Sequence, residues 1–454
     1  MHRPSFNQFT RRDLLRSTSC GFGYLALQGL AAQAAERDGG YTNPLAEKKP
    51  HFPARAKRVI FMFMQGGPSH LDTFDFKPAL QKSGGKGDGK SKLLASPFEF
   101  DRHGESGIHI SSLYPHLAKH ADELCILNGM HTTSPAHPQA TVAAHTGSIN
   151  FVRPSMGAWI TYGLGSSNED LPGFITINPV NNLGGAQNYG SAFLPASYQG
   201  TRVGTGKGSI SNIANPVLDT AAQRRQLDLV QEMNQEMLKR NRANAELEGV
   251  IESYELAYRM QTSVPGVMDL SKEPQKIKEM YGIGQKATND FGTQCLMARR
   301  LAESGVRFIQ VSHRGWDQHN SLSTRLKANC DATDKPIAAL IADLKRRDML
   351  KDTLIVWGGE FGRSPQGQNK DGRRHNNRGY SMWMAGGGVQ GGQRYGSTDD
   401  LGGIAVEGKM HTHDLHATIL HLLGLDHERL TYRYAGRDFR LTDVHGIVHD
   451  DIIA

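Results

Sequence analysis

Acidic and histidine side chains stand directly after apolar runs at several places in this sequence of 454 residues. The residues that carry this pattern are His70, Asp72, Asp317, His319, Glu360 and the later His375. Mixed imidazole and carboxylate ligands suit a divalent ion such as zinc, manganese or iron. Pairs of such ions stabilise the attacking and leaving oxygens of phosphoryl transfer. These six residues are therefore the predicted ligands of one or two metal ions, with zinc expected and calcium or manganese as alternatives.

A segment rich in histidine and hydroxyl groups follows another apolar run, and it holds His131, Ser134, His137 and His145. A loop histidine is more often hydrogen-bonded locally than bound to a metal, so it is the concentration of histidines that favours a site. The cation for a tetrahedral oxyanion is expected to be Arg363, or one of Arg373, Arg374 and Arg378. Guanidinium groups bind such oxyanions in a bidentate manner.

The apolar runs that precede these side chains indicate buried β-strands, at residues 58–64, 124–127, 306–312 and 353–357. Continuous apolar runs are typical of parallel strands that are covered on both faces. A helical pattern between the last two runs favours a parallel strand–helix–strand unit. Ligands bind at the carboxyl edge of such sheets. The sequence therefore predicts an α/β fold with a mostly parallel central sheet and a site at that edge.

Two further regions have a character of their own. Residues 219–260 and 287–303 show helical periodicity and predict a helical insertion at about 217–303, after an irregular stretch at 181–216. A later helix is expected at Met410–Gly424, with Gly424 at its C-terminal end. His411 and His413 open this helix, where they either face the site or cap the helix.

The N-terminus resembles an export signal. Arg11 and Arg12 precede an apolar stretch that ends at the small-x-small sequence Ala32-Gln33-Ala34. We expect residues 1–34 to be a twin-arginine signal peptide and 35–454 to be one exported domain, periplasmic or extracellular. The alternative is an amphipathic helix of the mature fold. No later apolar run is long enough to span a bilayer.

Charge and cysteine content narrow the class of protein. Residues 1–34 contain four arginines and one aspartate, so the formal charge of +7 falls to +4 when they are left out. This excess is too small to indicate nucleic acid binding and is compatible with anionic substrates. Cys125, Cys295 and Cys330 are widely spaced, so no disulfide framework is expected.

The order of the motifs resembles the alkaline phosphatase and sulfatase superfamily, and most closely the exported family catalogued as domain of unknown function 1501. The resemblance covers nearly all of the mature chain and rests on Gly66-Gly-Pro-Ser-His-Leu-Asp72, Trp316-Asp-Gln-His319, Gly358-Gly-Glu-Phe-Gly-Arg363 and Gly386-Gly-Gly388. It implies a three-layer α/β/α sandwich of the alkaline phosphatase type with divalent metal. It also implies an anionic ester substrate, a sulfated polysaccharide being one candidate.

The chain departs from that superfamily where the nucleophile is expected. It lacks the Cys/Ser-x-Pro-x-Arg motif, and His137 falls where the modified residue would stand. His137, Ser134, or another hydroxyl such as Thr133 or Thr141 would then lie at the reaction centre, or water activated by the metal would replace them. Two functions remain open. One is an exported metal-dependent hydrolase of sulfate or phosphate esters. The other is a non-catalytic metal- or glycan-binding member of the same fold.

Overall fold

A computed structural model describes residues 43–84, 92–179, 181–205, 217–240 and 245–454. The expected signal peptide at residues 1–34 lies outside the described residues. Within the described ranges, no helix is both long enough and apolar enough to cross a membrane.

The fold is organised around one nine-stranded sheet. Eight strands follow one another across it, and the short β15 (Met410–His411) pairs with β4 off this path. Their order is β12 (Gln393–Tyr395), β4 (Leu124–His131), β11 (Tyr380–Ala385), β8 (Thr353–Gly358), β1 (Arg58–Met64), β7 (Phe308–His313), β5 (Phe174–Ile177) and β6 (Thr201–Val203).

The sheet is largely parallel, as the apolar runs predicted. β1 is paired in parallel with β7 on one side and with β8 on the other. β11 alone runs against its neighbours, between β8 and β4. Because β4 and β8 are both antiparallel to β11, they point the same way. The carboxyl ends of β4, β8, β1 and β7 therefore meet along one edge.

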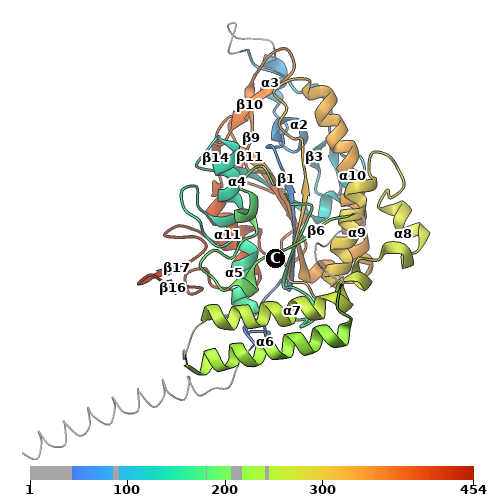
Figure 1. The fold of residues 1–454 in the computed structure, drawn as a ribbon. Helices are drawn as coiled ribbons and strands as arrows, with labels where there is room; N and C mark the ends of the chain where they lie inside the picture. The colour runs from blue at the N-terminus through green and yellow to red at the C-terminus, as the bar shows by residue number, and fades with distance from the viewer. Residues whose placement is uncertain (1–42, 85–91, 180, 206–216, 241–244) are drawn as a thin grey trace, which may run out of the picture.

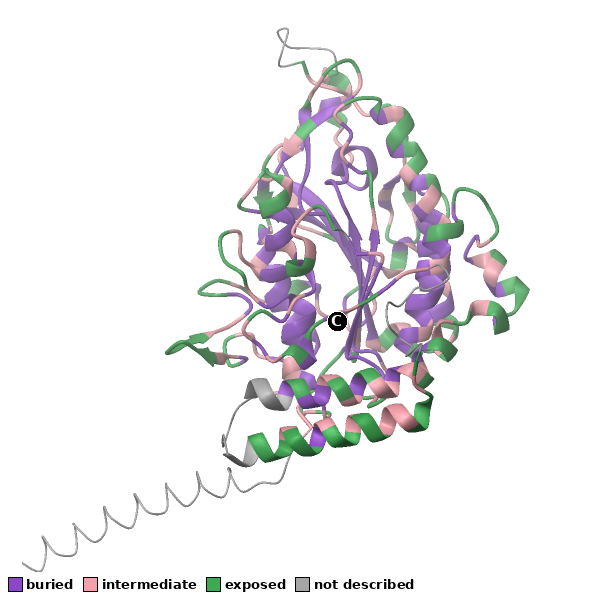
Figure 2. Cartoon of the chain, viewed as in Figure 1, coloured by how far each residue is buried: buried purple, intermediate pink, exposed green. Residues whose placement is uncertain are grey.

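Helices cover both faces of this sheet, as Figure 1 shows. One face carries α4 (His137–Thr146), α5 (Met156–Leu164) and α11 (Thr412–Leu422), and the other carries α9 (Asn289–Glu303) and α10 (Leu322–Arg346). The strands between these layers are almost wholly buried (Figure 2). This burial explains why the strands are apolar on both faces. The expected three-layer α/β fold with a mostly parallel sheet is confirmed.

The helical insertion forms a hairpin of α6 (Thr220–Arg240) and α7 (Ala245–Met268), followed by the short α8 (Gln275–Met280). Arg224 of α6 binds both carboxylate oxygens of Glu255 on α7, at 3.0 and 2.9 Å. α7 packs against α9, and Leu256, Met260 and Val264 are its buried residues toward the core. In Figure 1 the hairpin lies across the lower end of the molecule, beneath the sheet and its flanking helices.

Smaller elements complete the carboxyl edge. The turn α2 (His70–Thr73) follows β1, with α3 (Pro78–Ser83) after it. The hairpin of β9 (Gly362–Gly367) and β10 (Arg373–Asn376) follows β8. The remaining strands form three two-stranded sheets: β2 (Phe100–His103) with β3 (Ile108–Ser111), β13 (Ser397–Thr398) with β14 (Ala405–Glu407), and β16 (Tyr432–Tyr434) with β17 (Arg437–Phe439).

Candidate metal centre

Four side chains from three separate segments converge at the carboxyl edge. They are His137, Asp317, His319 and His375, and one ligand atom of each lies within 4.8 Å of the others. His137 is the first residue of α4, after β4, whereas His375 is on β10. Asp317 and His319 lie in the loop that follows β7. The sheet thus joins residues that are far apart in the sequence.

The second ring nitrogen of each histidine is already occupied by an oxygen. His137 Nδ1–H donates to Glu360 Oε1 at 2.6 Å. His319 Nδ1–H donates to Gln368 Oε1 at 2.6 Å, and His375 Nδ1–H donates to the Pro135 carbonyl at 2.7 Å. An oxygen acceptor at Nδ1 places the proton there. In the neutral rings, all three Nε2 atoms therefore carry a lone pair. Such oxygen partners are typical of metal-binding histidines.

The three Nε2 atoms and one carboxylate oxygen crowd around a common point. Asp317 Oδ1 lies 3.3 Å from His137 Nε2, 3.0 Å from His319 Nε2 and 3.3 Å from His375 Nε2. The Nε2 atoms of His319 and His375 are 2.9 Å apart. Lone pairs at these separations repel one another unless a proton or a cation lies among them. Zinc–nitrogen bonds of ~2.0–2.1 Å give tetrahedral edges of ~3.3 Å, close to these distances.

Glu360 lies behind His137 rather than among the ligand atoms. Its carboxylate is buried and accepts the backbone N–H of Gly66 at 3.0 and 3.1 Å as well as His137 Nδ1–H. Gly66 has φ of +117°, and a Cβ there would lie 2.6 Å from the Asp317 backbone nitrogen. Burial alone would lower the pKa of His137, but its hydrogen bonds to Asp317 and Glu360 outweigh this and raise the pKa to about 9. Glu360 was predicted as a metal ligand, and the structure places it as a hydrogen-bond partner of His137, outside the four-residue cluster.

Arg363 also lies behind the cluster. It was expected to hold a substrate oxyanion, but its side chain is fully buried. Its Nε–H donates to the Gly67 carbonyl at 2.9 Å, and its Nη2 binds the carbonyl of Gly66 and Asp317 Oδ1, the latter at 2.5 Å. With its donors used inside the protein, Arg363 fixes the Asp317 carboxylate. Desolvation raises the pKa of Asp317, but hydrogen bonds from His137 and His375, which form when these rings also carry a proton on Nε2, and the Arg363 charge bring it far below its usual range.

His70 and Asp72, the other predicted ligands, lie outside the cluster. Asp72 forms a fully buried bidentate ion pair with Arg373, at 2.7 Å to Nε and 3.0 Å to Nη2. His70 Nε2–H donates to the Gly402 carbonyl at 2.9 Å. Burial lowers the pKa of His70, so its ring is neutral and hydrogen-bonded. Both residues hold the fold together at the end of β1. The same ion pair removes Arg373 as an oxyanion ligand.

Ser134 lies in the turn before α4, where its Oγ accepts the backbone N–H of Ala136 at 3.2 Å. Thr133 Oγ1 is hydrogen-bonded to His411 Nε2 at 3.1 Å, and Thr141 is fully buried. In the described part of the chain, none of these three hydroxyls forms a hydrogen bond with the four cluster residues. The structure therefore brings His137 to the centre and leaves the predicted hydroxyl nucleophiles beside it.

The remaining histidines serve other purposes. His145 is buried, with Nδ1–H donating to the Thr141 carbonyl at 2.7 Å. His411 caps α11, because its Nδ1 accepts the backbone N–H of His413 at 3.2 Å while Asp414 accepts the His411 backbone N–H at 2.7 Å. His413 Nε2–H donates to the Gly147 carbonyl at 2.6 Å. The open question about His411 is answered in favour of the helix cap.

Two groups that orient the histidines were not predicted. Gln368 lies in the polar loop between β9 and β10, and the Pro135 carbonyl belongs to the main chain of the turn before α4. A lone glutamine in a polar loop gives no distinguishing signal, and a main-chain carbonyl gives none at all.

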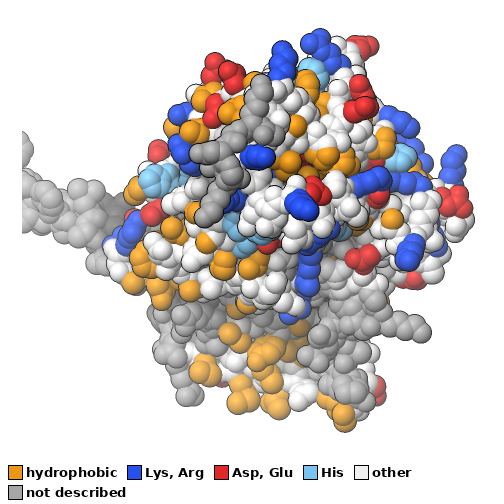
Figure 3. Space-filling model, turned by 90° about the horizontal axis from the view of Figure 1, so that it is seen from above, with side chains coloured by type: hydrophobic (Ala, Val, Ile, Leu, Met, Phe, Trp, Pro, Cys, Tyr) orange, Lys and Arg blue, Asp and Glu red, His pale blue; other side chains and the backbone are white. Residues whose placement is uncertain are grey.

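Figure 3 looks onto this end of the molecule, where acidic, basic and histidine side chains are mixed over the surface.

The cluster is open on its outer side. The side chain of Asp317 is 41% exposed and that of His319 is 33% exposed, whereas Glu360 and Arg363 behind them are at 0%. Buried groups thus fix the cluster from behind, while the side chains of Asp317 and His319 reach solvent in front. This is the arrangement of a site that leaves room for a substrate rather than that of a closed structural site.

A family model described as "Protein of unknown function (DUF1501)" matches residues 56–453. No match was found among curated proteins. Solved structures that are similar include the lipoteichoic acid synthase LtaP from Listeria monocytogenes, at 11% identity over 90% of this chain and 80% of that chain, with a TM-score of 0.37. The alkaline phosphatase from the Antarctic bacterium TAB5 is similar at 10% identity over 82% and 99% of the two chains, with a TM-score of 0.36. The PsFucS1 sulfatase from Pseudoalteromonas sp. is similar at 13% identity over 82% and 68%, with a TM-score of 0.34.

Proposed function

The chain belongs to the DUF1501 family of proteins of unknown function, and we propose that it is a metal-dependent hydrolase of phosphate or sulfate esters. The observation that carries the proposal is the convergence of three imidazole lone pairs and one carboxylate oxygen within 4.8 Å. Three nitrogens and one oxygen suit zinc, manganese or iron better than calcium, which prefers oxygen ligands. When bound, such an ion supplies Lewis-acid chemistry toward an ester oxygen and activates water.

The charge of the site supports an anionic substrate. Asp317 and Glu360 contribute two negative charges and Arg363 one positive charge, whereas His137 must be neutral to bind a metal. With a divalent ion the site would carry one net positive charge, at an opening where Asp317 and His319 reach solvent. Phosphate and sulfate esters are anions that such a site attracts.

Each partner of the cluster residues has a definite task in this proposal. Glu360 holds the His137 proton on Nδ1, and Gln368 does the same for His319. Arg363 fixes Asp317 from the buried side. Since the described hydroxyls Thr133, Ser134 and Thr141 form no hydrogen bond with the cluster, we propose direct attack by water rather than a covalent intermediate on the protein.

The test combines metal analysis with turnover. Purified protein should contain close to stoichiometric zinc, manganese or iron, and it should hydrolyse an aryl phosphate or an aryl sulfate. His319→Ala removes one ligand and should lose both metal and turnover. His109→Gln on β3, outside the cluster, is the matched control and should keep both. Protein without metal and without turnover of either ester would refute the proposal.

We also propose that the enzyme works outside the cytoplasm. The support is Arg11 and Arg12 ahead of an apolar stretch and a small-x-small sequence. Replacing both arginines by lysine should retain the full-length protein in the cytoplasm of a host that has the twin-arginine pathway. Unchanged export of this variant would contradict the proposal.

A further inference from the structure

A cavity of ≈ 1190 Å³ lies along the edge strand β6, between that strand, α7 and α9. It extends to residues that follow β5 and β7, among them Asn178, Asn181 and Arg314. Typical sites for drug-sized ligands measure ~300–1,000 Å³, so this cavity has room for a larger, chain-like ligand. The metal cluster does not include any residue that lines it.

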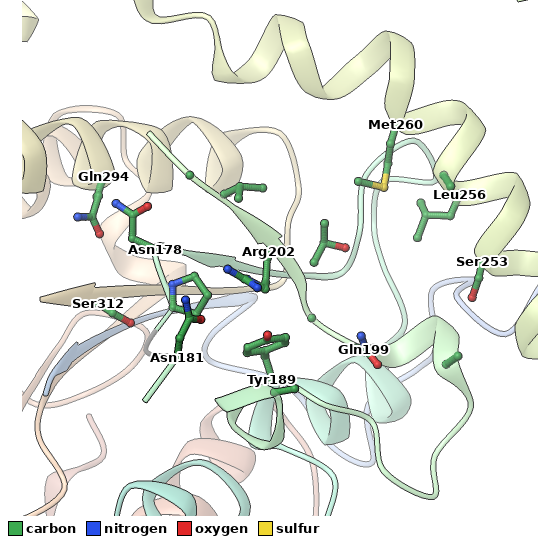
Figure 4. A pocket seen from close by; sticks show the side chains of 18 of the residues that line it. Asn178, Asn181, Tyr189, Gln199, Arg202, Ser253, Leu256, Met260, Gln294 and Ser312 are labelled. Carbon is green, nitrogen blue, oxygen red and sulfur yellow. The ribbon is translucent and has the colours of Figure 1, made fainter. Parts of the chain in front are cut away.

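The cavity wall is mostly neutral and polar. Its amide and hydroxyl side chains are Asn178, Asn181, Ser197, Gln199, Thr201, Ser253, Gln294 and Ser312. Such groups offer donors and acceptors together, as the hydroxyl groups of a sugar require. Leu256 and Met260 of α7 lie on one side of the cavity, and Tyr189 lies on another side, near Gln199 and Arg202 (Figure 4). Apolar and aromatic surface opposite polar groups suits a sugar ring, which has apolar C–H faces and polar edges.

Two buried polar atoms of this wall have no partner. Gln294 is 1% exposed and Ser197 is 7% exposed, and neither Gln294 Oε1 nor Ser197 Oγ has a hydrogen bond to any described residue. The Gln294 side-chain nitrogen donates to Asp290 at 3.2 Å, which leaves the oxygen as a free acceptor. Leaving a buried polar atom unsatisfied costs ~1–3 kcal/mol. Both residues line the cavity, so a hydroxyl group of a ligand becomes a partner for either atom once its side chain turns toward the cavity.

One arginine of the wall is free to bind an anion. Arg202 on β6 has an exposed side chain with no hydrogen bond or ion pair to the described residues, and it points into the cavity in Figure 4. The other, Arg314, donates from Nη2 to the Pro179 carbonyl at 3.1 Å. The one acidic residue of the wall, Asp290, already accepts hydrogen bonds from Thr205 and Gln294, so the two arginines leave the wall with one net positive charge. A guanidinium without a partner in such a wall indicates a ligand with acidic substituents such as sulfate, phosphate or carboxylate.

The cavity lies beside the metal cluster. His313 and Arg314 line it, and Asp317 of the cluster comes three residues later in the same loop. A fully extended chain spans at most ~3.6 Å per residue, so the Cα atoms of Arg314 and Asp317 lie within ~11 Å. On the other flank, Gln65 Nε2 donates to Asn182 Oδ1 at 3.2 Å, and the next residue, Gly66, binds Glu360. One chain of sugar units could reach from the cavity to the cluster.

From these contacts we infer that the cavity binds an acidic oligosaccharide, the organic part of the ester that the cluster hydrolyses. That this ligand is part of the hydrolysed ester rests on the proposed function. That the cavity binds a sugar rests only on the residues of the cavity. Arg202 binds an acidic substituent, the amides bind hydroxyl groups, and Tyr189 with the α7 wall contacts the ring faces.

The test is binding to metal-free, full-length protein, measured by calorimetry. The probes are hexasaccharides of a sulfated galactan and of a sulfated glycosaminoglycan, each with its desulfated counterpart. We expect at least one sulfated probe to bind more tightly than its counterpart. Arg202→Ala should weaken that binding about tenfold or more, because it removes a hydrogen bond to a charged group. Gln294→Leu should weaken it as well, and Arg202→Lys should restore part of it.

Arg433→Ala is the matched control, because Arg433 is an exposed arginine on β16 and should leave binding unchanged. The inference is overturned if no sulfated hexasaccharide binds, or if Arg202→Ala binds as the parent does. Binding of an acidic peptide in preference to every sugar probe would also overturn it. Aryl ester turnover with bound metal but without sugar binding would leave the hydrolase standing and refute only the cavity. Sugar binding that depends on Arg202, without metal or turnover, would do the reverse.

Discussion

His70 and Asp72 follow β1 just as Asp317 and His319 follow the neighbouring β7, yet only the second pair joins the cluster. The difference lies in what faces each acid. Asp72 is fully buried and both of its oxygens bind Arg373, whereas Asp317 is partly exposed and one of its oxygens contacts three imidazole nitrogens as well as Arg363. His70 Nε2–H donates to a backbone carbonyl, whereas Nε2 of His319 faces Nε2 of His375. An acid beside a histidine becomes a ligand pair only where the remaining partners leave lone pairs unsatisfied.

The largest expected effect separates the two acids by what they stabilise. Asp72→Asn leaves Arg373 buried with an unpaired charge, and removal of one member of a buried pair costs about 3–5 kcal/mol. We expect the free energy of unfolding to fall by that amount in urea denaturation of the metal-free protein. Asp438→Asn, in an exposed pair with Arg433, should cost less than about 1 kcal/mol. Equal losses in the two variants would show that the Asp72 pair is not the structural anchor described here.

The next effect concerns Glu360, which lies between the two regions. Glu360→Gln weakens the hold on the His137 proton, and loss of such a partner lowers metal affinity by about 10–100-fold. Competition with a chelator of known affinity measures the change. Glu428→Gln, at a surface ion pair with Arg440, is the control and should retain the parent affinity. If Glu360→Gln bound metal as tightly as the parent, Glu360 would have no part in orienting the ligand.

Much of this arrangement follows from the sequence, for a physical reason. Strands buried on both faces must be apolar throughout, so β1, β7 and β8 are visible as apolar runs, and the residues after them must lie at one edge. Asp317 and His319 were placed at that edge in this way. Gly358 and Gly359 likewise mark the end of β8 ahead of Glu360.

The sequence does not indicate which residues at this edge form the cluster and which form buried ion pairs. Arg373 reaches Asp72 across 301 positions of the chain, and nothing local to either residue indicates that pair. Arg363 was expected to face a substrate because it follows the carboxyl end of β8, but carbonyl groups of the loop after β1 enclose it. The cavity is built partly from the stretch 181–216 that was predicted to be irregular, and β6 within that stretch was not predicted because three residues give no periodic pattern. The signal peptide and the export route remain predictions.

A buried histidine that has no acidic partner makes the stability of the protein depend on pH. Burial lowers the pKa of His416 to about 3, and its Nε2–H donates to the Ala144 carbonyl. The unfolded chain therefore takes up a proton near pH 6.5 that the folded chain refuses. Stability should fall as the pH decreases below 6.5, by about 1.4 kcal/mol per pH unit for this residue.

His416→Gln keeps a donor for the Ala144 carbonyl but cannot titrate, so its unfolding free energy should depend less steeply on pH between 6.5 and 4. Denaturant titrations of the metal-free protein at several pH values measure both slopes. The exposed His445→Gln is the surface control. An unchanged slope in His416→Gln would mean that the buried ring is already charged in the folded protein.

The smallest effect is expected at His411, which the sequence placed either at the site or at the start of a helix. Its Nδ1 caps α11, and replacing a capping residue by alanine costs about 1 kcal/mol. His411→Ala should therefore lower the free energy of unfolding by that amount, and His411→Asn, which supplies another side-chain acceptor, should recover most of it. Metal content should equal that of the parent in both variants, because His411 contributes no atom to the cluster of His137, Asp317, His319 and His375. Loss of metal in His411→Ala, with the fold intact, would show that His411 binds the metal. The distinction between metal-binding histidines and histidines that only stabilise the fold would then not hold.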